Sequence, residues 1–142
     1  MLPPDAEEII KAKTDELSRR YHIQPPHIVY SKYLGICYAE GMLHFHELVV
    51  WFVNNLIFHD RIADAQAFAR YLAAHEFLHY LHHMRGSLSY KTYEWERPYE
   101  QRKEEISATK FGTVESGYTT EQLDALMREF NEFLRRKYWH FR

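Results

Sequence analysis

The sequence predicts a single α+β domain in which a helix comes first, a small sheet follows and three further helices complete the chain. Apolar residues keep helical spacing before residue 22 and after residue 60, whereas short β-branched and aromatic runs lie between them. With 142 residues, of which 46% are hydrophobic, the chain is long enough to form one hydrophobic core. It is too short to form two domains that each have a core of sufficient size. We therefore treat residues 1–142 as one domain, with a core over about residues 5–112 and a C-terminal helix over 119–142.

The first predicted helix follows two prolines near the N-terminus. Asp5 is its expected N-cap, and Glu8, three residues on, completes the spacing of a capping box. The stretch "QPPH" ends the helix, because two consecutive prolines cannot continue its hydrogen bonding. Helical spacing is kept by Ile9, Ile10, Leu17 and Tyr21.

Residues 27 to about 53 predict a small sheet of three to four strands, mostly antiparallel. The run "HIVYSKY" is typical of a strand, and "GICYAEGMLHFH", with turn residues at Glu40 and Gly41, is typical of a hairpin. The next run, "ELVVWFVNNLIF", is so uniformly apolar that its periodicity cannot decide between strand and helix. For this run we favour a buried strand that ends at Asn54 and Asn55 over a short helix.

Three helices are predicted after Asp60. The segment "RIADAQAFARYLAAHEFLHYLHHMRG" is rich in alanine and leucine and ends at Gly86, which is typical of a helix with a C-terminal glycine. A polar, aromatic connector then leads to a helix that ends at Gly112. The last helix begins at Thr119 or Thr120, both suitable N-caps. Its expected apolar face consists of Leu123, Met127, Phe130 and Leu134.

Composition argues against several classes of protein. A net charge of −2 gives no electrostatic reason to expect a nucleic acid or an acidic membrane as the main partner. Cys37 is the only cysteine, so an internal disulfide and a zinc site built on several thiolates are excluded. The stretch "MLPPDAEEII" does not have the basic start and apolar run of a secretory signal, and the longest apolar run, "LVVWFV", is far shorter than the roughly 20 residues of a membrane helix. We therefore expect an intracellular, cytoplasmic protein of unspecified oligomeric state.

The segment "AAHEFLH" carries the chemistry that the sequence indicates most clearly. His75 and His79 are four residues apart, so on a helix their Cβ atoms lie about 5–6 Å apart on one face, which suits two ligands of one Zn²⁺. Glu76 lies about 100° further round the helix, from where it can act as general base on a water that the ion activates. HEFLH thus matches H-E-x-x-H, although a helix that is merely rich in histidine remains the alternative.

The third ligand would decide the class of the site. A metzincin requires a histidine six residues after the second one, and that position is Arg85, so this class is excluded. The segment "KEEISATKFGT", about 25 residues downstream, offers carboxylates instead. Glu104 is favoured, because it shares a mixed helix face with Glu100, Ala108 and Phe111 that can turn inward. Glu105 is the alternative, since it shares a face with Gln101, Arg102 and Thr109 that is typical of solvent exposure, and Glu100 is the third choice.

HExxH followed by a glutamate on the next helix resembles the gluzincins, a class of zinc peptidases. "EEISATKFGT" is similar to the thermolysin-type stretch E-A-I-S-D-x-F-G-T if Glu104 is the ligand, but Ala108 then stands in place of the aspartate that orients the first histidine. Over roughly Asp5 to Gly112, the order of elements is similar to that of the compact gluzincins, namely minigluzincins and the ImmA/IrrE-type and SprT-like domains. The resemblance implies a zincin-like fold and zinc-dependent hydrolysis of peptide bonds in a peptide or protein substrate.

The same resemblance implies where a substrate would bind. An extended peptide would lie antiparallel to an edge strand at about Leu43 to His46, and a tyrosine or histidine would assist the oxyanion. Tyr93 and His82 are candidates for that role, although His82 and its neighbour His83 are also typical of partly exposed polar groups. Two further candidates for the oxyanion are Tyr90 and Tyr118.

Three other functions compete with this hypothesis. A zincin-like domain can be latent or inactive and act by binding a protein partner, with the C-terminal helix as a plug in its cleft. A di-iron bundle requires two E-x-x-H pairs on different helices, but Glu76 and His79 form the only such pair. A phosphohydrolase with an adjacent His-Asp, as at His59 and Asp60, requires an all-helical scaffold, which the strand-like region after His27 argues against.

Overall fold

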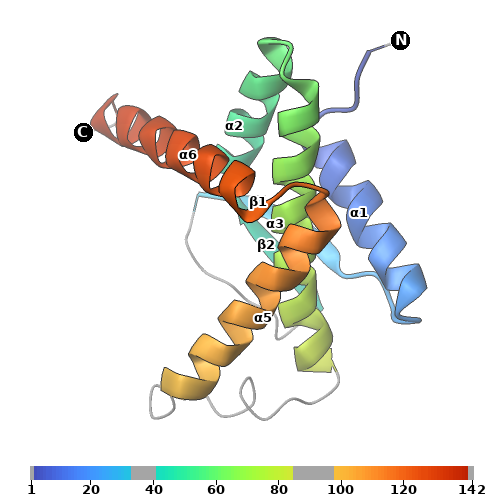
Figure 1. Cartoon of the computed structure of the whole chain (residues 1–142). Helices are drawn as coiled ribbons and strands as arrows, with labels where there is room; N and C mark the ends of the chain where they lie inside the picture. The colour runs from blue at the N-terminus through green and yellow to red at the C-terminus, as the bar shows by residue number, and fades with distance from the viewer. Residues whose placement is uncertain (1, 33–40, 85–97, 141–142) are drawn as a thin grey trace.

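A computed structural model describes residues 2–32, 41–84 and 98–140 of the chain. This part is mostly helical with one small sheet, an α+β arrangement as predicted (Figure 1). The elements in chain order are α1 (Ala6–Arg20), β1 (His27–Ser31), β2 (Met42–His46), α2 (Glu47–Phe58), α3 (Ile62–Met84), α5 (Pro98–Ser116) and α6 (Thr120–His140).

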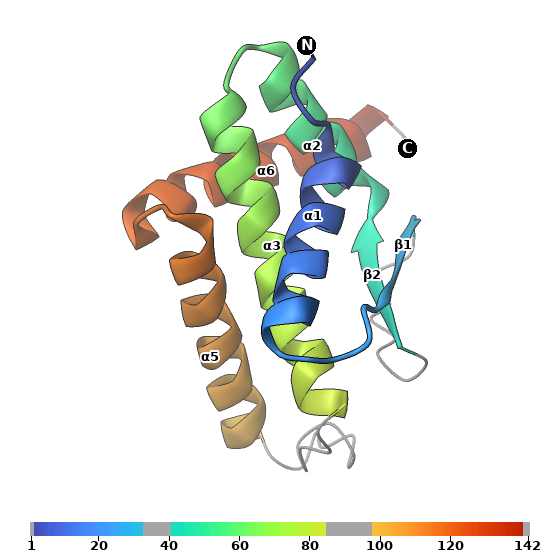
Figure 2. The same cartoon turned by 90° about the vertical axis from the view of Figure 1, so that its right-hand side faces the viewer.

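Helix α3 is the central element of the fold. It contacts α1, α2, α5, α6 and β2, and it lies between α1 and α5 in the view of Figure 2. Its alanines let these neighbours approach closely, because a methyl group leaves the helix backbone accessible on several sides. The alanines without solvent exposure are Ala65, Ala69, Ala73 and Ala74, and Phe68, Phe77 and Tyr80 fill the spaces between the helices. The core is therefore built around the helix that carries HExxH.

Helix α1 begins as the sequence predicts. The Asp5 side chain accepts a hydrogen bond from the Glu8 backbone N–H at 2.9 Å, and the Glu8 side chain accepts one from the Asp5 backbone N–H at 3.3 Å. This reciprocal pair is a capping box, so two of the otherwise unpaired N–H groups at the helix start are satisfied. Ile9, Ile10 and Leu17 are buried in the core, which confirms the predicted apolar face.

The run Glu47–Phe58 is helix α2, so the strand interpretation favoured from the sequence is wrong. The His46 ring caps the helix, because its Nδ1 accepts a hydrogen bond from the Leu48 backbone N–H at 3.1 Å. Asn54 does not end a strand: its side-chain oxygen accepts a hydrogen bond from the Ala6 N–H at 2.9 Å and so ties α2 to the start of α1. The buried residues Leu48, Val49, Phe52, Val53 and Leu56 recur at helical spacing.

The sheet differs from the prediction in size and direction. Strands β1 and β2 pair in parallel, with His27 opposite Met42 and Ser31 opposite His46, and they form a two-stranded sheet. The three to four mostly antiparallel strands are not found in the described residues, because the run expected to supply a further strand forms α2. The first arm of the predicted hairpin falls on residues 35–40, which lie outside the described part.

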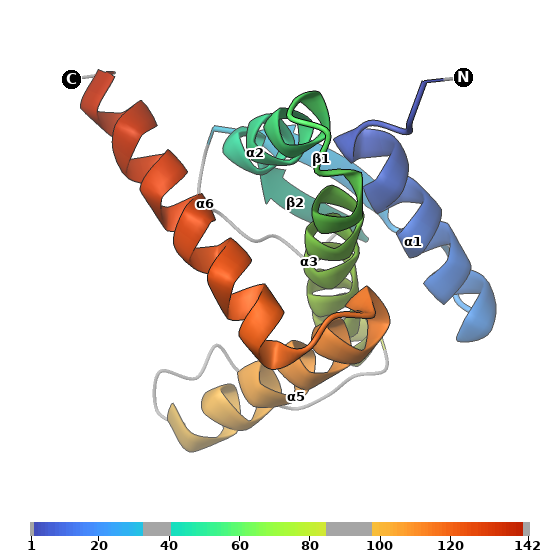
Figure 3. The same cartoon turned by 45° about the horizontal axis from the view of Figure 1, so that its top comes forward.

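Helix α6 belongs to the core and extends it beyond residue 112. Its start is confirmed, since Thr119 and Gln122 exchange hydrogen bonds of 3.2 and 2.9 Å between side chain and backbone N–H. The helix leaves the end of α5 and passes α3 and α2 (Figure 3), where Phe130 packs on Phe52 and Phe68 at ring-centroid distances of 5.2 and 5.5 Å. No helix in the described ranges has both the length and the apolar character that crossing a membrane requires.

Candidate metal centre

Helices α3 and α5 run antiparallel and very close together. Gly112 is buried against Tyr71: a Cβ atom at Gly112 would lie 2.8 Å from the Tyr71 carbonyl oxygen and 2.9 Å from its ring. The glycine therefore permits close packing within α5, and the predicted helix end at Gly112 is wrong. The helix continues to Ser116, and Gly117, with φ +81°, is the residue that adopts the left-handed conformation after it.

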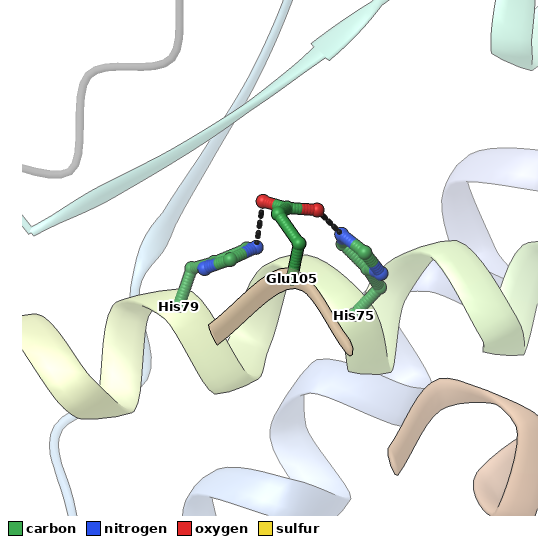
Figure 4. Close-up of side chains that lie close together, drawn as sticks. All are labelled: His75, His79 and Glu105. Atoms are coloured by element: carbon green, nitrogen blue, oxygen red, sulfur yellow. Dashed lines mark ion pairs between the residues drawn. The ribbon is translucent and has the colours of Figure 1, made fainter. Parts of the chain in front are cut away.

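This packing brings three side chains with metal-ligating atoms together (Figure 4). The two carboxylate oxygens of Glu105, on α5, lie 3.2 Å from His75 Nε2 and 2.8 Å from His79 Nε2, on α3. One donor atom from each of the three side chains lies within 4.8 Å of the others, so the group can hold a metal ion. The centroids of the two imidazole rings are 5.0 Å apart, and the His79 side chain is only 4% exposed.

Glu105 remains ionised in this position. Its hydrogen bonds with His75 and then His79 hold its pKa well below the ordinary value, and they outweigh burial, which acts in the opposite direction. Two imidazole nitrogens and one ionised carboxylate are a donor set that can hold a Zn²⁺ ion.

The favoured third ligand, Glu104, is not part of this group. Its carboxylate lies 3.2 Å from Nδ1 of His82, further along α3. The face assignments themselves agree with the structure, since Ala108 is fully buried and the Glu105 side chain is 61% exposed. The imidazoles of His75 and His79 are largely buried, at 13% and 4% exposure, and Glu105 reaches their Nε2 atoms from the exposed flank of α5. The Glu100 side chain falls outside the described part.

Glu76, the predicted general base, lies beside the group without belonging to it. Its Oε1 is 3.9 Å from His75 Nε2, the nitrogen that faces Glu105, and its side chain is partly buried. The carboxylate is thus on the side of the imidazole where a metal ion would be held, as the HExxH spacing predicts.

The other nitrogen of His75 has no hydrogen-bond partner among the residues that the structure describes. Nδ1 is buried, although a metal-ligating histidine usually donates from this position to a carboxylate or carbonyl. Helices α3 and α5 are antiparallel, and Gly112 faces Tyr71. His75 lies about one turn after Tyr71, and the buried Ala108 lies about one turn before Gly112, so we infer that Ala108 lies opposite His75. The alanine at the expected place of the orienting aspartate thus coincides with the absence, among the described residues, of a hydrogen bond to this imidazole nitrogen.

The remaining predicted site residues are spread over the chain. Tyr118 donates a hydrogen bond of 2.6 Å to Asp64 at the start of α3. Burial is the main cause that raises the pKa of Tyr118 to about 12, and the hydrogen bond with the Asp64 carboxylate is the second. Asp64 precedes His75 by about 16 Å along the helix axis, so Tyr118 is not at the metal centre. His83 is partly buried near the end of α3. Tyr90 and Tyr93 lie outside the described residues.

Tyr71 is a neighbour of the site that the sequence reasoning missed. Its ring centroid is 5.9 Å from that of His75, and its hydroxyl shares a hydrogen bond with Thr109 on α5. Burial raises the pKa of Tyr71, and the negative charges of Glu105, Asp124 and Glu76 add to the effect. The spacing in the sequence indicates this position, because Tyr71 is four residues before His75 and so lies on the same face of the helix.

The likeness to gluzincins rests on two short motifs and on the order of the elements. Comparison with known proteins found no family model, no curated protein and no solved structure that matches this chain.

Proposed function

We propose that this protein is a zinc-dependent peptidase whose single metal ion is held by His75, His79 and Glu105. The observation that carries the proposal is the convergence of three donor atoms from two helices within 4.8 Å. Two imidazoles and one carboxylate are a donor set typical of catalytic zinc, which keeps three protein ligands and leaves one position open. The exposed flank on which Glu105 lies would leave that position accessible to water and substrate.

The ion, when bound, would supply a Lewis acid for a water molecule and for the peptide carbonyl. Glu76 would accept the proton of the attacking water, because its carboxylate lies next to the metal-facing nitrogen of His75. The same carboxylate would then deliver the proton to the nitrogen of the departing amine. His75 and His79 would hold their positions throughout, since both belong to α3, which is packed against α1, α2, α5, α6 and β2.

The substrate would bind as an extended strand along β2. In the described residues β2 pairs only with β1, and it packs on α3, which carries both histidines. Backbone hydrogen bonds to the second edge of β2, at about Leu43 to His46, would give affinity without strict dependence on sequence.

A second candidate is a binding module of the same fold that performs no reaction. The contacts of Glu105 with both imidazoles favour it, because they would link α3 to α5 whether or not an ion is bound. Such a protein would act through a partner rather than through Glu76.

Elemental analysis and a hydrolysis assay separate these candidates. For the purified chain and its Glu76→Gln variant we expect one zinc ion per chain, with cleavage of an unstructured protein such as casein by the parent only. His79→Ala should lose the ion. Zinc without cleavage in the parent would support the binding module, equal cleavage by Glu76→Gln would refute the assigned base, and a parent that binds no zinc would refute the metal centre.

A further inference from the structure

A groove begins at the metal centre and follows α5. It has a volume of about 600 Å³, and it lies between the exposed flank of α5 and the first residue of α6, Thr120. Glu105 lines one end of it. The residue that contacts both imidazoles therefore also forms the beginning of the groove, and a chain bound at the metal centre would continue into it.

The groove follows one face of the helix. Glu105, Thr109 and Thr113 all line it, and because they are four residues apart they lie in a row about 12 Å long. An extended polypeptide advances about 3.3 Å per residue, so this row spans between three and four residues of a bound chain. Side chains that point the same way along such a chain are about 6.6 Å apart, which leaves room for two of them.

The chemistry of the groove is apolar. Ile106 and Val114 line it and are exposed to solvent by 55% and 75%. The three threonines add methyl groups, and Lys110 is the only described lining residue besides Glu105 that carries a charge. Covering Ile106 and Val114 would remove apolar surface from water, which an aliphatic side chain can do and a charged side chain cannot.

We propose that this α5 groove binds the part of a polypeptide substrate next to the scissile bond and selects aliphatic side chains there. The inference rests on the proposed peptidase function and extends it, because it assigns a substrate preference to the same site. Ile106 and Val114 are the residues that determine the preference, whereas Glu105 connects the groove to the metal centre.

Binding of two capped tetrapeptides tests the inference directly. The zinc-loaded Glu76→Gln chain is titrated with acetyl-Ala-Leu-Ala-Leu-amide and with acetyl-Ala-Asp-Ala-Asp-amide, and the amide NMR signals of the chain are followed. The leucine peptide should shift the signals of Thr109 and Thr113 and bind at least about tenfold more tightly than the aspartate peptide. Ile106→Asp and Val114→Asp should remove this preference. Phe58→Asp is the matched control, since Phe58 is an apolar residue on α2 that is 85% exposed and does not line the groove.

The outcomes distinguish a failure of the proposed substrate preference from a failure of the proposed peptidase activity. Equal binding of the two peptides, or unchanged preference in both Ile106→Asp and Val114→Asp, would overturn the inference even if the parent cleaves casein. Selective binding of the leucine peptide by the groove, together with a parent that cleaves nothing, would instead refute the peptidase function and retain the groove as a binding site.

Discussion

One carboxylate oxygen of Glu105 lies 2.8 Å from Nε2 of His79, although the first side chain is largely exposed and the second is buried. The two residues come from helices that are packed together independently of this contact, through Gly112 and Tyr71. The core therefore fixes the imidazoles, whereas the carboxylate reaches them from the surface. Because of this asymmetry, Glu105 can be replaced without disturbing the core.

Glu105→Gln should lower the zinc affinity by more than about 100-fold, because the loss of a ligand should exceed the usual cost of losing an outer-shell contact. Glu104→Gln is the matched control, with the same chemical change one residue away, and should alter the affinity by less than about threefold, since Glu104 faces His82. Competition with a chromophoric chelator measures both. If Glu104→Gln strongly lowered the zinc affinity and Glu105→Gln did not, Glu104 would be the third ligand, as favoured from the sequence.

Ala108→Ser and Ala108→Asp should raise the zinc affinity about tenfold, because either side chain can accept the hydrogen bond that His75 Nδ1 does not make. The same competition assay applies. Ala65→Ser, at a fully buried alanine near the start of α3, is the control for placing a hydroxyl in the core. If both Ala108 variants fold and neither binds zinc more tightly than the parent, Ala108 does not face that nitrogen.

Gly112→Ala should lower the free energy of unfolding by about 1–3 kcal/mol, because the new methyl group would overlap the Tyr71 carbonyl and force α3 and α5 apart. Helix propensity alone predicts the opposite sign, a gain of about 1 kcal/mol. Urea denaturation at neutral pH decides between the two effects. Ser107→Ala, at an exposed position of the same helix, should change stability little. A stabilised Gly112→Ala chain would show that the helices are less tightly packed.

The ion pairs of Glu115 should make stability depend on pH. Glu115 lies 2.7 Å from the buried Lys13 and 2.9 Å from Arg20, and these partners outweigh burial and hold its pKa below the ordinary value of about 4.5. Because the folded pKa is lowered, the stabilisation is complete above the ordinary pKa and is lost as the pH falls through the folded value. Glu115→Gln should therefore cost about 1–3 kcal/mol at pH 7, and this difference should shrink below about pH 4.

Urea denaturation from pH 7 to pH 3 measures this difference. Asp15→Asn is the control, because Asp15 pairs with the largely exposed Lys11 at 2.7 Å, and such pairs contribute only about 0.3–0.5 kcal/mol. A Glu115→Gln cost that is the same at pH 7 and pH 3 would contradict the assigned cause.

A chain that ends at Ser116 should not fold. Helix α6 places Leu126 in the main core and packs Phe130 on Phe52 and Phe68, so its removal would expose apolar surface on α2 and α3. Circular dichroism and near-ultraviolet spectra of the truncated chain measure the loss. A truncated chain that stays folded and gains peptidase activity would instead support a role of α6 as a plug.

The sequence allowed the parts of the fold that depend on local chemistry to be predicted. The capping box at Asp5 and the start of α6 at Thr119 follow from side chains that satisfy nearby backbone groups, and such signals require no knowledge of distant contacts. The identity of α2 could not be decided in the same way. In the run Glu47–Phe58 almost every residue is apolar, and the alternation of buried and exposed positions became visible only once its neighbours were known.

The two histidine ligands on α3 could be predicted from the sequence, whereas the glutamate ligand on α5 could not. The reason is again that local spacing is visible in the sequence and the packing of distant elements is not. Four-residue spacing on one helix places His75 and His79 together whatever the tertiary structure. The choice between Glu104 and Glu105 depends instead on how α5 is rotated against α3. We assumed that a ligand must lie on the buried face, whereas Glu105 reaches the imidazoles from the exposed flank. Periodicity indicates which residues share a face, but not which face borders an open site.

The division of the ligands between α3 and α5 has a thermodynamic consequence. A cation held by all three side chains can bind only while the two helices are docked, so its binding is linked to folding. Free zinc at 100 times its dissociation constant would add about 2.7 kcal/mol to the free energy of unfolding. The melting temperature of the chain would then rise with the concentration of free zinc. This rise could be used to measure zinc binding.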